Sequence, residues 1–195
     1  MKTISCTIQG VSPLLQDKRP MPSQPIILVK GKPYLDRTLI VEPGRKNKIE
    51  TIELMDKCHH DGKGIYLEFQ SVFKTICNAG KLIEGKTRRQ TMMKTFLIGI
   101  VIKPERIYIE PQQEPEPFIR PLKREDGQLV TAVSAMFNKW SLSFDILVNE
   151  DTVDIKKLKE AVELGGTLVG IGVWRPADTG GRFGTYKLTK WEINK

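Results

Sequence analysis

The order of strand-like and helix-like segments along the chain predicts an α+β protein built from two strand–helix–strand units. Residues 3–10 and 140–148 alternate apolar and polar side chains, which is typical of half-buried strands. Residues 67–80 and the segment after Asp151-Thr152 repeat apolar residues at helical spacing. Because each helical segment is expected between two strands, both helices can cover one face of a single sheet.

The first two elements carry the clearest patterns. In residues 3–10, Ile4, Cys6 and Ile8 fall on one side of the expected strand. Gly80 suits the left-handed position just past the end of the helix expected over 67–80. The apolar face of that helix follows the spacing i, i+3, i+4, i+7, i+8 and consists of Phe69, Val72, Phe73, Ile76 and Cys77. Cys77 is therefore expected in the core and not as a nucleophile.

The middle and the end of the chain supply the remaining elements. The apolar run 95–102 predicts a strand, which residues 106–110 continue or pair with. Asp151-Thr152 can cap the second helix, and Gly165-Gly166 are expected to end it. Short strands are then expected over 167–173 and, as the last element, over about 183–192.

This order of elements matches the βαββαβ core of ferredoxin-like (RRM-like) domains. The arrangement leaves one face of the sheet for a ligand, the face on which RNA-recognition modules stack bases. Two segments interrupt the order and are interpreted as insertions, about 16–64 and 111–138, in a single domain spanning residues 1–195.

The two insertions differ in composition. Residues 16–64 contain scattered prolines and many cations, Arg45 and Lys46 among them, and face nucleic acid or form a solvated loop. Their short apolar runs, 26–29 and 39–41, could be hairpin strands. Residues 111–118 are acidic and rich in proline, which predicts an extended, exposed connection.

Composition narrows the class of protein. With 31 Lys and Arg against 23 Asp and Glu, the net charge of +8 suits a polyanionic partner. A hydrophobic content of 39% is enough for a core. The three cysteines form no disulfide pattern, which indicates a reducing compartment. No signal peptide or membrane-spanning run is evident, so we expect a soluble cytoplasmic protein with no membrane partner.

The most unusual stretch is glycine-rich and lies near the C-terminus. Seven glycines occur within the twenty residues 165–184, together with Arg175 and Arg182 and with two aromatic residues, Trp174 and Phe183. Glycines let consecutive amides point into one concavity that binds phosphate, while guanidinium groups add charge and aromatic rings offer stacking faces. The alternative is a hairpin whose glycines only serve tight turns.

Three stretches carry a resemblance to a known family. The Val-Ser-Pro-Leu-Leu sequence at 11–15 is similar to the opening strand and turn of the RAMP superfamily of CRISPR-associated RNA-binding proteins. Residues 170–188, GIGVWRPADTGGRFGTYKL, resemble its glycine-rich loop and closing strand. Ile65-Tyr66, leading into the helix with Ser71, resembles its entry to the first helix. Uncharacterised proteins of bacterial viruses carry a similar ending after a W-x-L-x-F strand, here Trp140 to Phe144.

The resemblance implies a backbone subunit that binds single-stranded RNA or DNA, with RNA as the first expectation, without reading its sequence. It also implies possible head-to-tail assembly of a homo-oligomer along the strand, in a prokaryotic cell or a virus-infected host. No cofactor is expected. The loop residues that match the family, with the arginines beside them, are Gly170, Gly172, Arg175, Gly180, Gly181, Arg182 and Gly184. The cation-rich segment 85–94 adds Arg88 and Arg89 to this expected nucleic-acid surface, and Arg45 and Lys46 come from the first insertion.

Catalysis is not the first expectation. Cys58-His59-His60-Asp61 are all ligand types, but four adjacent ligands rarely converge on one ion, so no metal site is expected. Some RAMP members cut RNA without metal through a histidine, which His59 or His60 could supply if their loop folds onto the glycine-rich stretch. Asp56 or Asp61 could instead resemble a catalytic aspartate. The alternatives to simple binding are therefore a metal-independent RNA endonuclease and a viral assembly or protein-interaction module.

Overall fold

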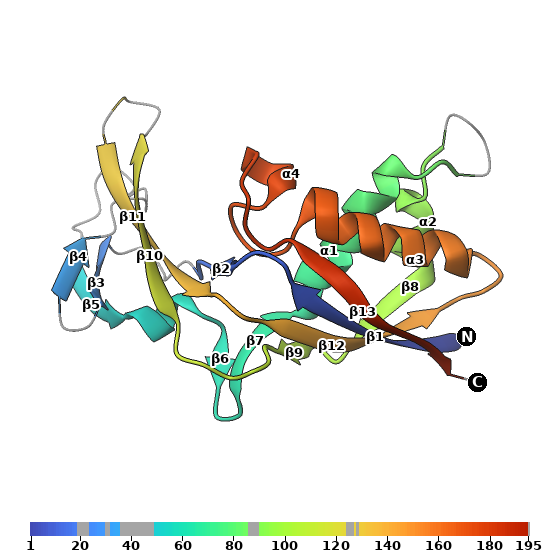
Figure 1. The fold of residues 1–195 in the computed structure, drawn as a ribbon, viewed down its shortest axis with the longest axis horizontal. Coiled ribbons are helices and arrows are strands. Elements are labelled where there is room, and N and C mark those ends of the chain that lie inside the picture. Colours follow the sequence, from blue (N-terminus) through green and yellow to red (C-terminus); the bar gives the residue numbers. More distant parts are fainter. Residues whose placement is uncertain are drawn as a thin grey trace.

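A four-stranded antiparallel sheet forms the centre of the computed structural model, which describes residues 1–18, 24–29, 32–35, 49–85, 90–123, 127 and 129–194 (Figure 1). The strands lie in the order β13–β1–β12–β8, and two helices cover one face of the sheet. The strands are β1 (Lys2–Gly10), β8 (Ile100–Lys103), β12 (Ser141–Val148) and β13 (Tyr186–Asn194), and the helices are α1 (Phe69–Ala79) and α3 (Ile155–Leu164). The α+β fold class predicted from the sequence is confirmed.

The alternating pattern of β1 places this strand at the centre of the sheet. Ile4 and Ile8 are fully buried beneath the helices, and Cys6 is 2% exposed. The strand pairs with β12 on one side and with β13 on the other, in both cases antiparallel. A strand with one apolar face and two hydrogen-bonding edges is held on three sides, which explains why the alternation of apolar and polar residues is clear in its sequence.

The first helix lies where the sequence predicts it, but Gly80 plays another part. Gly80 has a right-handed φ of −59° and begins a 3-10 turn over Gly80–Leu82. A Cβ at this position would lie 2.8 Å from the ring of Phe96. The residue is therefore required for close packing against the neighbouring helix α2 (Met93–Gly99), and not for a left-handed cap.

The strand expected over 95–102 is wrong for its first half. Residues up to Gly99 belong to α2, in which Phe96 is buried and Ile98 is 81% exposed, and only β8 is a strand. A short apolar run does not distinguish a buried helix from a strand. Residues 106–110 also pair elsewhere, because β9 (Arg106–Tyr108) lies beside β7 (Gly64–Glu68).

The second helix begins three residues later than expected. Its N-cap is Asp154, whose carboxylate accepts hydrogen bonds from the amides of Lys156 at 2.8 Å and Lys157 at 3.4 Å. Asp151-Thr152 instead lie in a turn, which closes where the amide of Val153 donates to the carbonyl of Asn149 at 2.9 Å. The buried side chain of Val153 anchors this turn.

Gly165-Gly166 do not end the second helix, and residues 167–173 are not a strand. The chain continues from α3 through a π-helical turn, Gly165–Val169, and leaves the helical path at Gly170 with φ 73°. A Cβ on Gly166 would overlap the carbonyl oxygen of Tyr186. These glycines therefore let the turn pass closely over β13.

The remaining strands form small sheets beside the central one. One sheet has the order β10–β11–β2, another β4–β3–β5, and a third β6–β7–β9. Their bounds are β2 Leu14–Gln16, β3 Gln24–Val29, β4 Lys32–Leu35, β5 Ile49–Glu53, β6 His60–Asp61, β10 Glu116–Lys123 and β11 Leu129–Phe137. A 3-10 turn spans Leu54–Lys57, and the four-residue helix α4 spans Pro176–Thr179.

The expected insertions contain most of these strands. The run at 26–29 is indeed part of a strand, β3, while residues 39–41 lie outside the described residues. Residues 111–115 form no helix or strand, and β10 begins at Glu116. The assignment of residues 1–195 to one domain stays a prediction. Among the described residues, no helix is both long enough and apolar enough to cross a membrane.

The three cysteines provide a test of this core. Burial raises the pKa of the Cys6 and Cys58 thiols to about 12 and that of Cys77 to about 11. We expect no thiol to react rapidly with a thiol-specific dye in the native protein near pH 8, because the thiolate is the nucleophile. In denaturant all three should react. A native thiol that reacts at the rate of a free cysteine would contradict this packing.

Candidate nucleic-acid interface

The glycine-rich loop, defined here as residues 170–184, lies against the turn that follows β1. The amide of Val173 donates to the carbonyl of Leu15 at 3.1 Å, and that of Gly184 donates to the carbonyl of Pro13 at 2.8 Å. Just after the loop, Thr185 donates its amide to the Ser12 hydroxyl at 3.0 Å. Two of the three sequence stretches that carry the resemblance are thus in direct contact.

Most glycines of the loop are required by its backbone. Gly170, Gly172, Gly180 and Gly184 have φ between 64° and 84°, which favours glycine. The amides of Gly170, Gly180 and Gly184 donate to main-chain carbonyls of the protein itself. Within the described residues the amides of Gly172 and Gly181 make no such hydrogen bond. Only a part of the loop therefore has amides available for a phosphate.

The two arginines of the loop differ in their surroundings. Arg175 makes a bidentate ion pair with Asp178, with Nε–Oδ2 at 2.7 Å and Nη2–Oδ1 at 2.9 Å. Its side chain is only 16% exposed. Arg182 is exposed and makes no ion pair among the described residues. Arg175 therefore has a fixed guanidinium, while that of Arg182 is open to solvent.

The aromatic residues of the loop face the β10–β11 hairpin. The guanidinium carbon of Arg120 lies 3.0 Å from the centre of the Trp174 ring, a close cation–π contact. Phe183 meets Phe118 edge to face, with ring centres 4.8 Å apart. These contacts hold the hairpin against the loop. They also cover parts of the Trp174 and Phe183 rings on which bases were expected to stack.

A cavity of about 240 Å³ opens beside the glycine-rich loop. The loop contributes Gly172, Val173 and Arg175 to its wall. Helix α1 contributes Ser71 and Lys74, while residues 15–18, His59 and Leu67 complete the lining. Two of the site residues expected from the loop, together with one expected from the histidine pair, thus lie around a single cavity.

Charge in the cavity is predominantly positive. Lys18, Lys74 and Arg175 come from three separate segments. The one carboxylate in the lining, Asp17, lies 2.6 Å from the ammonium group of Lys57, which is 1% exposed. Because Lys57 neutralises Asp17, the cavity retains a net positive lining that suits a phosphate group.

His59 is held in place at the rim of this cavity. Its amide donates to the side-chain oxygen of Gln16 at 2.9 Å, and Gln16 is buried. The imidazole Nδ1 lies 3.9 Å from Glu68. Partial burial lowers the pKa of His59, although the nearby carboxylate of Glu68 acts in the opposite direction. The ring is therefore largely neutral near pH 7.

The other candidates from this segment are engaged elsewhere. His60 does not line the cavity and lies 3.9 Å from Asp56, a surface pair. The carboxylate of Asp61 accepts hydrogen bonds from the amides of Lys63 and Gly64 and from the side chains of Arg106 and Tyr108. These bonds lower the pKa of Asp61 and make it a structural hub.

The arrangement of the Cys58, His59, His60 and Asp61 side chains does not favour a metal site. Cys58 is fully buried in the core, while His60 beside it is exposed. Within the described part of the chain, no three His, Cys, Asp or Glu side chains lie close enough together to hold a metal ion.

Sequence reasoning missed the lysines of the cavity. Lys74 lies on the exposed face of α1, and Lys18 follows β2, where single cations are common on any protein. Arg45, Lys46, Arg88 and Arg89, which were expected at the interface, lie outside the described residues.

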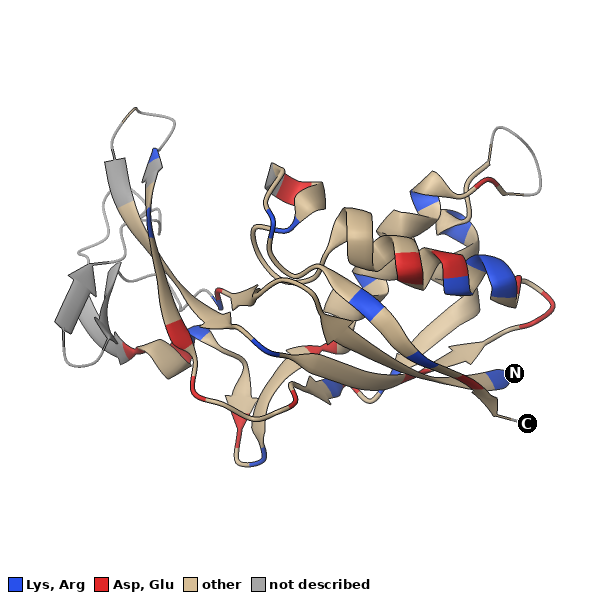
Figure 2. Cartoon of the chain, in the orientation of Figure 1, with Lys and Arg blue, Asp and Glu red and all other residues tan. Residues whose placement is uncertain are grey.

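The open face of the central sheet is not a base-stacking surface. Its β1 and β12 side chains bond to one another, as in Ser5 with Asp145 at 2.7 Å and Thr7 with Ser143 at 3.0 Å. In the register of the four strands, none of the described residues on this face is aromatic. Figure 2 shows Lys and Arg spread over helices and strands, so the positive charge is not concentrated on this sheet.

Comparison with known proteins finds similarity to solved structures only. No protein-family model and no curated protein matches the chain. The fold is similar to that of a chain in the cryo-EM structure of the Type III-B Cmr-beta bound to cognate target RNA. The TM-score is 0.55 at 12% identity, and the match covers all of this chain and 61% of the other. The chain thus spans less than two thirds of this structural neighbour, and at this identity the similarity shows a shared fold alone.

Replacement of loop glycines by alanine tests the packing role assigned to them. A Cβ on Gly184, at φ 69°, would overlap the carbonyl oxygen of Ile171. We expect Gly184→Ala to lower the free energy of unfolding by more than about 2 kcal/mol, since a strained φ and overpacking add. Gly180 has a similar φ but open space around it, so its alanine variant should cost about 1 kcal/mol.

Urea denaturation of both variants provides the measurement, and Gly62→Ala is the control. Gly62 has no strained φ and no neighbour within 4 Å, so this variant should unfold like the wild type. Equal stabilities of the Gly180 and Gly184 variants would refute the close approach at Gly184.

Proposed function

We propose that the protein binds single-stranded nucleic acid, RNA in preference to DNA, through its sugar-phosphate backbone. The observation that carries the proposal is the convergence of Lys18, Lys74 and Arg175 on one cavity beside the glycine-rich loop. Cations from three segments around a concave surface suit a phosphate, and none of them presents a pattern for reading base edges.

The fold supports the same proposal. The strand order β13–β1–β12–β8, with α1 and α3 on one face, is the arrangement expected of a ferredoxin-like core. We therefore assign the chain to the RAMP type, and the similar solved structure contains target RNA. The proposal includes head-to-tail assembly of copies along the strand, in the cytoplasm of a prokaryotic cell or of a virus-infected host.

Arg175 can contribute although it is paired. Asp178 occupies the edge of the guanidinium that carries Nε and one hydrogen of Nη2. The opposite edge, with Nη1 and the second hydrogen of Nη2, can still donate to a phosphate oxygen. Asp178 thereby restricts the rotamers of Arg175, while Arg182, which is exposed, is proposed to contact the strand outside the cavity.

Variants of the cavity lysines test the proposal. Lys74→Ala and Lys18→Ala should each weaken binding of a labelled RNA strand by about fivefold near 0.1 M salt. The reason is that each phosphate contact on a single strand contributes about 0.7 to the slope of log K against log salt. Fluorescence anisotropy across a salt series gives both the affinity and the slope, for RNA and for DNA of the same sequence.

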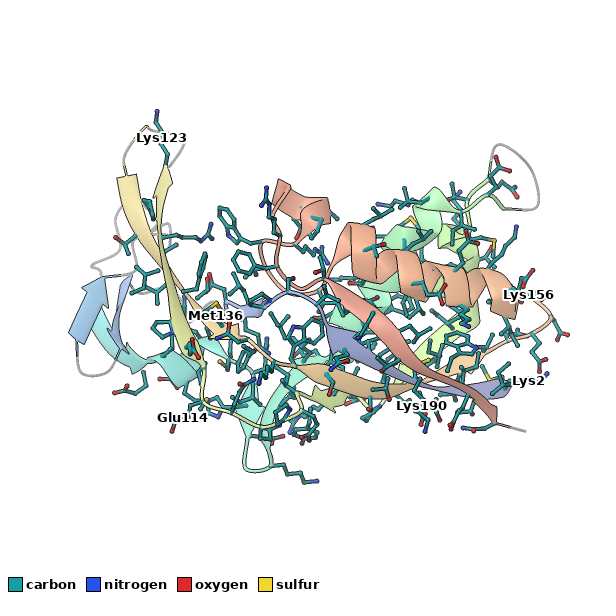
Figure 3. All side chains as sticks on the ribbon, viewed as in Figure 1. Lys2, Glu114, Lys123, Met136, Lys156 and Lys190 are labelled. Carbon is teal, nitrogen blue, oxygen red and sulfur yellow. The ribbon has the colours of Figure 1, made fainter. Side chains whose placement is uncertain are left out.

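Lys190→Ala is the matched control, because it removes the same charge from another surface. Lys190, labelled in Figure 3, lies on β13 and pairs with Glu192 at 3.0 Å. Its variant should keep the affinity and salt slope of the wild type. Binding that does not change with salt, or equal losses in the Lys74 and Lys190 variants, would refute the proposal.

A second candidate function is metal-independent cleavage of RNA. It is favoured by one observation, that His59 lines the same cavity as Gly172 and Arg175. A neutral imidazole can act as a general base toward a ribose hydroxyl, and a guanidinium can stabilise the charge on the phosphate. His60 does not line this cavity and lies near Asp56 instead.

Cleavage of hairpin RNA in the presence of a chelator separates the two candidates. If the protein is an endonuclease, His59→Ala should abolish cleavage, while His60→Ala should cleave like the wild type. The rate should rise with pH through the pKa of His59, which lies below the ordinary value of 6.5. Intact RNA after incubation with the wild-type protein would leave binding as the function.

A further inference from the structure

Bases of a bound strand need a surface to stack on, and most aromatic rings of the protein cannot provide it. Those of the central sheet and of the helices, together with Phe137 and Trp140, lie in the core or pack against it. Trp174 and Phe183 face Arg120 and Phe118 of the hairpin. Among the aromatic side chains that the structure describes, Tyr66 and Tyr108 remain, and both are half-buried.

These tyrosines lie side by side on the small sheet β6–β7–β9. They are direct cross-strand partners, and their rings meet edge to face with centres 6.0 Å apart. The alternation of the strands puts Arg106 on the same face as Tyr108, and its guanidinium lies 5.2 Å from the centre of the Tyr66 ring. The side chain of Arg106 is 58% exposed, so a guanidinium plane and two tyrosines share one accessible surface.

The surface is continuous with the cavity described above. The imidazole of His59 lines the cavity and has its centre 5.9 Å from that of Tyr66. His59 therefore links the cavity to this face. We call the surface formed by His59, Tyr66, Arg106 and Tyr108 the tyrosine face.

Charge on the tyrosine face is nearly balanced. Arg106 makes an ion pair with Asp61 at 2.8 Å, and Asp61 also accepts from the hydroxyl of Tyr108 at 3.0 Å. Glu68 lies 3.9 Å from His59 at the edge of the face. This surface cannot attract phosphate strongly, but it offers flat π-systems, and base stacking is tolerant of sequence.

We infer that the tyrosine face is a stacking platform for one or two unpaired nucleobases of a strand whose backbone enters the adjacent cavity. The inference rests on the proposed function and adds to it a second contact of different chemistry. The cavity supplies salt-dependent contacts to phosphate, and the tyrosine face supplies base-dependent contacts that do not change with salt.

Two labelled RNA strands of equal length, one with bases and one with abasic residues at its centre, test the inference. Tyr66→Leu should weaken binding of the strand with bases on the order of tenfold and leave the abasic strand unaffected. Its salt slope should equal that of the wild type. Tyr66→Phe is the matched control, because it keeps the ring, and should bind both strands like the wild type.

Tyr108→Leu carries the same expectation and guards against misfolding of the first variant, with thermal unfolding as the check on both. Lys74→Ala should weaken both strands equally, which separates the cavity from the platform. Equal losses on both strands for the tyrosine variants, or no loss on either while Lys74→Ala weakens binding, would overturn the inference alone. A wild-type protein that binds neither strand would overturn the proposed function with it.

Discussion

Main-chain contact between residues 11–15 and the glycine-rich loop is the constraint on which the candidate site depends. The turn after β1 is itself fixed by Trp140, which is buried and donates its indole N–H to the carbonyl of Ser12 at 2.8 Å. The amide of Gly184 then donates to the carbonyl of Pro13, and a Cβ on Gly172 would overlap the carbonyl oxygen of Leu15. Because backbone meets backbone, the loop cannot shift without breaking these main-chain hydrogen bonds.

This constraint decides which groups remain for a ligand. Amides that hold the loop in place are no longer donors for phosphate, so side chains and the amide of Gly172 supply the chemistry of the cavity. Thr75 extends the constraint to α1, since its hydroxyl lies 2.9 Å from the carbonyl of Gly170. Lys74, the preceding residue, is thereby brought to the cavity on a helix that is tied to the loop.

Sequence reasoning succeeded where burial on one face sets a period, as in β1 and α1, and failed where a residue serves an approach from elsewhere. The sequence predicts that Gly165-Gly166 end a helix. In the structure, glycine is needed there because β13, some twenty residues further along the chain, passes close to them. Gly172, Arg175 and His59 were singled out from the sequence, whereas Lys18 was only one of many cations in the first insertion and Lys74 was not named. Lys18 and Lys74 reach the cavity only through long-range packing, which a local sequence pattern does not predict.

The chain has a net charge of +8, but ion pairs offset several of its cations, so the positive electrostatic field is confined to few places. Arg106 is offset by Asp61, Arg175 by Asp178 and Lys57 by Asp17. Each pair fixes geometry but adds little net field. Lys18 and Lys74 make no ion pair among the described residues, so the field at the cavity depends on them. A protein arranged in this way would attract a strand at one point and hold the rest of it by contacts that need no charge.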